Sequence, residues 1–147
     1  MPEKETLERA EQDKREGKSP STQAGEFVRE EMHHIREGKH GAANTKQAIA
    51  IGLSKARRAG VDMPAPKGSA SSETRKKAAQ DTRAAKSHRK TSAKRSRATS
   101  AALKRKGRSA ASKKNLSKQA RSAAKKRSSS ARHESAMKAA RTRKRAA

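Results

Sequence analysis

The large apolar side chains of this chain lie mostly in its first 63 residues, where they recur at helical spacing. Between Ser19 and Gly38 they return every three or four positions, so that one helical face is apolar. Acidic residues lie early in this stretch and basic residues late, which suits the helix dipole. The pattern predicts a helix that begins at Ser19-Pro20 and ends at Gly38, with an apolar face made of Ala24, Phe27, Val28, Met32 and Ile35.

A second helix is predicted between Asn44 and Gly60. Asn44 is followed three residues later by Gln47, a pair that resembles a capping box. A short glycine-containing turn separates the two helices, so residues 19–63 are predicted to form a small helical hairpin. We expect it to be marginally stable and to gain from self-association, a protein partner or nucleic acid. The apolar positions of the second helix are Ala48, Ile49, Ile51, Leu53 and Ala56.

Gly25 and Gly52 lie inside the two predicted helices, where a glycine destabilises a helix by up to about 1 kcal/mol. One explanation is that the helices cross closely at these positions. The other is that the glycines simply weaken the helices. The sequence leaves both explanations open.

Residues 1–18 are predicted to be a charged N-terminal arm. Glu5 with Arg9 and Glu11 with Arg15 are favourable pairs on a helix, but only Leu7 and Ala10 offer apolar surface. A polar helix of this length is marginal by itself. We therefore expect a frayed, solvated arm in front of the hairpin.

Residues 64–147 differ sharply from the hairpin in composition. Of the 40 lysines and arginines, 28 follow residue 66, but only three of the 14 acidic residues do, so residues 67–147 carry a formal charge of +25. Large apolar side chains are limited to Leu103, Leu116 and Met137. Such a segment is expected to be a disordered, low-complexity tail. It is helix-prone, because it is rich in alanine, lysine and arginine and has no proline after Pro66. The fold class expected is mostly α with extensive disorder.

Charge of one sign at this density predicts a polyanionic partner. We expect non-sequence-specific binding of duplex DNA through phosphate contacts, as in a histone-like, nucleoid-associated protein. Two alternatives stay open: an RNA- or ribosome-associated protein, and an adaptor whose hairpin binds a protein partner. The clustered cations expected to contact phosphate are Arg75, Lys76, Lys77, Arg89, Lys90, Lys94, Arg95, Lys104, Arg105, Lys106, Lys113, Lys114, Lys125, Lys126, Arg127, Arg141, Arg143, Lys144 and Arg145.

Two resemblances accompany these predictions. The segments from Phe27 to His34 and from Thr45 to Gly60 resemble a small family of uncharacterised bacterial proteins with a methionine-histidine segment and a lysine-glutamine-alanine-isoleucine helix. This resemblance covers roughly residues 17–66 and implies a bacterial source but no activity. The basic tail is similar in composition to the tails of linker histones and of bacterial histone-like proteins, although it lacks their proline.

Catalytic and metal chemistry are not predicted. The chain has no cysteine and no phosphate-binding glycine loop or hydrolase motif, so we expect neither an enzyme nor a cofactor. His33, His34 and His40 lie near Glu30, Glu31 and Glu37, but adjacent histidines on a helix point about 100° apart. Glu30 and His34 could share a helix face, but a solvated helix end with histidines that suit the dipole explains the pattern, so we expect no metal site. No secretory leader or membrane span is apparent, so a cytoplasmic, nucleoid-associated location is expected.

Overall fold

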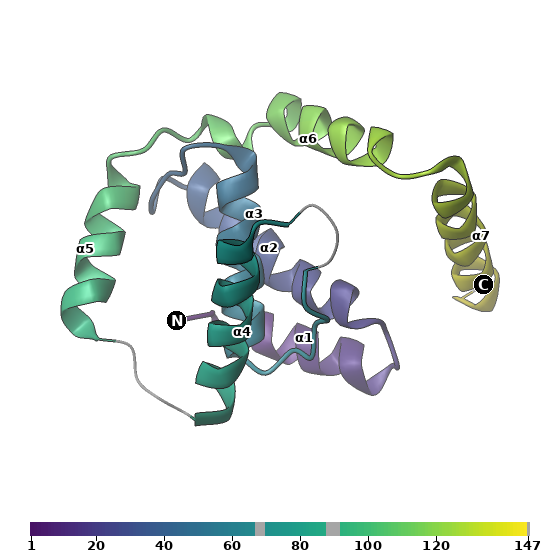
Figure 1. The fold of residues 1–147 in the computed structure, drawn as a ribbon, viewed down its shortest axis with the longest axis horizontal. Coiled ribbons are helices and arrows are strands. Elements are labelled where there is room, and N and C mark those ends of the chain that lie inside the picture. The colour runs from purple at the N-terminus through teal and green to yellow at the C-terminus, as the bar shows by residue number, and fades with distance from the viewer. Residues whose placement is uncertain (67–69, 88–91, 147) are drawn as a thin grey trace. The chain divides into compact units, whose positions relative to one another are not determined.

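The computed structural model describes residues 1–66, 70–87 and 92–146, which divide into two compact units at residue 112. Unit 1 spans Met1–Ser112 and unit 2 spans Lys113–Ala147. Figure 1 labels the α-helices along the chain. Unit 1 contains α1 (Lys4–Arg15), α2 (Pro20–Arg36), α3 (Thr45–Arg58), α4 (Ser72–Ser87), α5 (Ala93–Lys104) and the short 3-10 helix η1 (Ser109–Ala111), and unit 2 contains α6 (Lys113–Lys125) and α7 (Ser129–Ala146).

The two predicted helices of the hairpin are confirmed as α2 and α3. Pro20 occupies the first turn of α2 after Ser19. At the start of α3, the Asn44 side chain accepts a hydrogen bond of 2.9 Å from the backbone N–H of Gln47. The Gln47 side chain in turn accepts one of 2.7 Å from the backbone N–H of Ala43. This reciprocal capping fixes where α3 begins, as the Asn44–Gln47 spacing predicts.

The ends of α1, α2 and α3 share one stop signal. Gly17, Gly38 and Gly60 follow these helices with φ of 68°, 79° and 95°, in the left-handed region that favours glycine. After α1, the N–H of Lys18 returns to the carbonyl of Asp13 at 2.9 Å, and after α2 that of Lys39 returns to His34 at 3.0 Å. The sequence Arg-Glu-Gly-Lys, which occurs at residues 15–18 and again at 36–39, is therefore a repeated helix C-cap.

The N-terminal helix packs on the hairpin instead of extending into solvent. Ala10 of α1 is buried with Ala24, Phe27 and Ala56 in the core of unit 1. Arg9 Nε donates a 2.7 Å hydrogen bond to Glu26 Oε2, which ties α1 to α2. The segment expected to be a solvated arm is instead a packed helix, because its two apolar residues, Leu7 and Ala10, both pack in or against the core.

The predicted disorder of residues 64–147 is wrong, while the mostly α part of the fold class is confirmed. Helices α4, α5, α6 and α7 occupy most of the described residues after Pro66. Alanine, lysine and arginine favour helix, and no proline interrupts them. A polar contact also anchors α4: the buried Asp81 accepts hydrogen bonds from Ser54 Oγ at 2.6 Å and Arg58 Nε at 2.8 Å. Neither the helix propensity nor the contacts of Asp81 depend on large apolar residues, whose scarcity led to the expectation of disorder.

Residues 103–111 dock against the turn end of the hairpin through backbone groups. The N–H of Gly41 donates to the carbonyl of Leu103 at 3.0 Å. Thr45 Oγ1 donates to the carbonyl of Ala110 at 2.7 Å, and Arg36 Nε donates to that of Ala111 at 3.0 Å. Unit 1 therefore extends to Ser112, well beyond the boundary expected at Pro64.

The two helix glycines have different roles. A Cβ placed on Gly52 would lie 2.7 Å from the backbone Cα of Val28, so α2 and α3 cross closely at this point. A Cβ on Gly25 would meet nothing within 4 Å. The close-crossing explanation therefore holds for Gly52 and fails for Gly25.

This difference predicts opposite effects of the same substitution. Gly52→Ala is expected to destabilise unit 1 by about 1–3 kcal/mol, because the helix backbones must separate. Gly25→Ala, its matched control, is expected to stabilise by about 0.5–1 kcal/mol through helix propensity. Urea unfolding followed by circular dichroism measures both. An equal stabilisation by the two substitutions would show that the helices do not cross closely.

Candidate functional site

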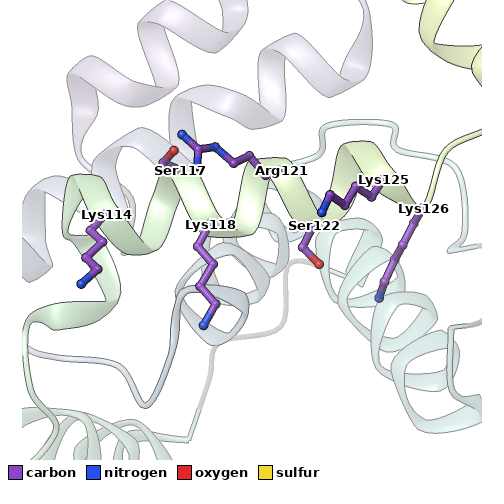
Figure 2. Close-up of a pocket in the computed structure, with 7 residues that line it drawn as sticks. All are labelled: Lys114, Ser117, Lys118, Arg121, Ser122, Lys125 and Lys126. Atoms are coloured by element: carbon purple, nitrogen blue, oxygen red, sulfur yellow. The ribbon is translucent and has the colours of Figure 1, made fainter.

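The most regular basic surface is one face of α6 in unit 2. Lys114, Lys118, Arg121 and Lys125 are spaced four, three and four residues apart, which places them on one side of a helix. With Ser117, Ser122 and Lys126 they line a pocket (Figure 2). In this view the ammonium ends of Lys114, Lys118 and Lys126 point the same way. We call Lys114, Lys118, Arg121 and Lys125 the α6 basic face.

The α6 basic face has no acidic neighbours in the sequence. No aspartate or glutamate lies between Asp81 and Glu134. All four side chains are exposed. Eleven residues of helix separate Lys114 from Lys125, a distance of about 16 Å along the axis. The face therefore presents a row of uncompensated cations to solvent.

The cations predicted from the sequence are distributed over four helices and the segments that join them. Those within described residues are exposed. Lys77 also pairs with Asp81, with Nζ 3.5 Å from Oδ1, and Arg127 donates to the carbonyl of Ala131. Arg89 and Lys90 lie outside the described residues. In chain order, Arg75, Lys76 and Lys77 lie on α4, Lys94, Arg95 and Lys104 on α5, Arg105 and Lys106 just after it, Lys113, Lys114 and Lys125 on α6, Lys126 and Arg127 between α6 and α7, and Arg141, Arg143, Lys144 and Arg145 at the end of α7.

Two members of the α6 basic face are absent from the sequence prediction. Lys118 and Arg121 have no adjacent cation, and the prediction selected runs of neighbouring lysines and arginines. A search at helical spacing would have found both, because they continue the row from Lys114 to Lys125. In a disordered tail, residues three or four positions apart do not share a face, so the expected disorder gave no reason to group these cations.

A second feature lies inside unit 1, where five titratable side chains form what we call the buried charge cluster: Glu30, Glu31, His34, His40 and Lys55. Lys55 Nζ lies 2.8 Å from Glu31 Oε2 and 3.2 Å from Glu30 Oε1. His40 Nε2 lies 3.2 Å from Glu31 Oε1. The two carboxylates come from α2 and the ammonium from α3, so the cluster joins the two helices of the hairpin.

Lys55 and the N-terminus of α1 keep Glu30 ionised. Burial tends to raise the pKa of Glu30, but hydrogen bonds from the Glu3 backbone N–H and from Thr6, together with the charge of Lys55, lower it overall. Burial tends to lower the pKa of Lys55, but Glu31 and Glu30 raise it overall. Buried charges are tolerated when they are paired in this way.

Glu31 is the least well compensated member of the cluster. Its side chain is 0% exposed, and neither carboxylate oxygen accepts a well-aligned hydrogen bond. Lys55 Nζ at 2.8 Å and His40 Nε2 at 3.2 Å therefore contact Glu31 as charge partners, in a geometry that is poor for hydrogen bonding. A buried carboxylate of this kind depends on nearby positive charge.

Comparison with known proteins finds a family match for the hairpin. Residues 18–67 match a family of unknown function (DUF6496). The match includes both helices of the hairpin and all five residues of the buried charge cluster, and it agrees with the expected resemblance to an uncharacterised family. No curated protein and no solved structure matches the chain. No helix in the described parts of the chain is long and apolar enough to cross a membrane.

Proposed function

We propose that this protein binds duplex DNA through its phosphates, without reading base sequence, and that the α6 basic face is a principal contact. The observation that carries the proposal is the row of four exposed cations on one helix face, in a stretch of sequence with no aspartate or glutamate between Asp81 and Glu134. Along one strand of duplex DNA the phosphates recur about every 3.4 Å of axis, so the 16 Å length of this row spans about five of them. The row of cations and this stretch of phosphates are similar in length and opposite in charge, which favours contact along the groove edge.

The chain is poorly equipped for the other modes of recognition. Binding to single strands relies on stacking between bases and aromatic side chains. The one aromatic residue, Phe27, is 0% exposed in the core of unit 1. Reading of bases in a groove uses lysine or arginine against guanine and asparagine or glutamine against adenine, and the α6 basic face carries no asparagine or glutamine. Flexible lysine and arginine contacts position a protein without selecting a sequence.

A charge-matched pair of variants tests the proposal. We expect replacement of Lys114, Lys118, Arg121 and Lys125 by Gln to make the log–log salt slope of binding less negative by about 3–4. Affinity for random-sequence duplex DNA in low salt should fall by more than tenfold. The control replaces Lys4, Lys14, Arg29 and Lys46 by Gln, which removes the same charge from exposed positions of unit 1. It should change affinity by less than about threefold.

Two results would overturn the proposal. Equal losses in both variants would mean that total charge governs binding and that the α6 basic face is no site. Stronger competition by ribosomal RNA than by duplex DNA at matched salt would assign the protein to RNA instead.

A further inference from the structure

We infer that Glu31, His34 and His40 form a binding site for a divalent transition-metal ion of the zinc class. Among the described residues, these three offer one ligand atom each within 4.8 Å of one another. Glu31 and His34 lie one turn apart on α2, and His40 follows the Gly38 turn that ends this helix. The inference concerns unit 1 and does not rest on the proposed binding of DNA.

The hydrogen bonds of His40 determine which ring nitrogen is free. His40 Nδ1 lies 3.1 Å from the carbonyl oxygen of Gly41. A carbonyl only accepts, so Nδ1 carries the hydrogen. In a neutral ring, Nε2 then presents its lone pair to Glu31 Oε1, 3.2 Å away. Two lone pairs at this distance repel each other unless a cation lies between them.

His34 shows the same arrangement. Its Nε2 lies 2.8 Å from Glu3 Oε1. Lys39 Nζ also lies 3.1 Å from this oxygen, and a carboxylate beside an ammonium group accepts hydrogen bonds. His34 Nε2 therefore donates, and Nδ1 is left with its lone pair. Metal-binding histidines commonly donate their second ring N–H to a carboxylate or a backbone carbonyl in this way.

The charge of the cluster also favours a bound cation. Glu30 and Glu31 contribute two negative charges, and Lys55 contributes one positive charge. With neutral imidazoles the buried charge cluster therefore has a net charge of −1. Lys55 occupies Oε2 of Glu31 and leaves Oε1 facing His40. Burial of net charge is unfavourable, and a divalent ion on Oε1 would offset it.

The donor set and spacing suit zinc or cobalt better than calcium or magnesium. Two imidazole nitrogens and one carboxylate oxygen are typical ligands of zinc, whereas calcium and magnesium take oxygen ligands. Bonds of about 2.0–2.1 Å place tetrahedral ligand atoms about 3.3 Å apart. His40 Nε2 and Glu31 Oε1 already meet this spacing at 3.2 Å. The side chains of His34 and His40 are 12% and 16% exposed, so the ring edges reach solvent.

Cobalt titration of the full chain tests the site directly. The protein is stripped of metal with a chelator and kept in about 0.5 M salt, which weakens binding of contaminating nucleic acid. We expect one equivalent of Co²⁺ to produce the visible absorption of a tetrahedral nitrogen–oxygen site, and Zn²⁺ to displace it. His34→Gln or His40→Gln should weaken binding at least tenfold. His33→Gln, an exposed neighbour on α2, should leave it within about twofold.

A measurement on the unsubstituted protein keeps the test independent of folding defects. Zinc should shift the imidazole NMR signals of His34 and His40 and leave those of His33 and His133 unchanged. The inference is overturned by absence of saturable binding, by equal weakening in His33→Gln, or by imidazoles that are doubly protonated and insensitive to zinc. The last result would mean that a proton supplies the missing charge.

Discussion

A chain that ends at Ser112 is expected to bind random-sequence duplex DNA at least about 100-fold more weakly than the full chain in low salt. The deleted unit carries 13 of the 40 lysines and arginines and a single glutamate. It also carries the whole α6 basic face. Each lost phosphate contact removes about 0.9 from the log–log salt slope, so the slope should become markedly shallower. Fluorescence anisotropy with a labelled duplex measures both quantities.

The position of the cut makes this result interpretable. A cut at Pro66 would also remove Asp81, which pairs with Ser54 and Arg58, and the segment that docks on Thr45. A cut after Ser112 keeps unit 1 whole. Circular dichroism should show that the shortened chain stays helical. A shortened chain that binds duplex DNA as tightly as the full chain would contradict the proposed role of α6, and one that keeps its cellular role without binding would favour a protein-interaction adaptor.

Lys55→Met is expected to destabilise unit 1 by about 3 kcal/mol, the largest effect of any single substitution that we predict. Lys55 is the ammonium partner of both Glu30 and Glu31, whose side chains are only 2% and 0% exposed. Removal of this charge leaves two carboxylates buried close together. Methionine preserves most of the side-chain packing, so the loss reports on charge. Urea unfolding at pH 7 measures the free energy of unfolding.

Lys46→Met is the matched control, because Lys46 lies on the same helix with an exposed side chain. It should change stability by less than about 0.5 kcal/mol. Acid should reduce the difference between Lys55→Met and the unsubstituted protein. Lys55 helps to lower the pKa of Glu30, so its stabilisation is present above the unfolded pKa and is lost as pH falls. A loss that stays constant as the pH falls well below 4.5, the ordinary pKa of a glutamate, would indicate a packing defect instead.

The hairpin could be predicted from the sequence because its signals are local. The apolar face of α2, the Asn44–Gln47 cap and the glycine stops each act within a few residues. They place α2 and α3 almost at their observed ends. The helix dipole and capping rules need no knowledge of the rest of the chain.

The packing of α1 and the order after Pro66 could not be predicted because their contacts are between distant polar or small groups. Ala10 joins a core with Ala24, Phe27 and Ala56, and Asp81 anchors α4 as one of only three acidic residues after residue 66. Asp81 changes the net charge of this segment by only one, so the charge does not reveal the structural role that its burial gives it. The contacts made by residues 103–111 use backbone carbonyls, which leave no pattern in a sequence.

The buried charge cluster likewise could not be predicted from residues that are close in sequence. Adjacent histidines on a helix diverge, so His33 and His34 point in different directions. His40, however, returns toward α2 after the Gly38 turn, and its ring centroid lies 6.0 Å from that of His34. Lys55 arrives from α3, 24 residues after Glu31. Only the folded hairpin brings these groups together.

The salt dependence of binding to random-sequence duplex DNA tests the central claim most directly. If about ten phosphates are contacted, the logarithm of the affinity should fall with the logarithm of salt concentration with a slope near −9. Binding should be tight at about 50 mM salt and at least about 1,000-fold weaker at about 200 mM. A slope near zero, or no binding at the lower salt concentration, would contradict the claim that this protein holds duplex DNA by its phosphates.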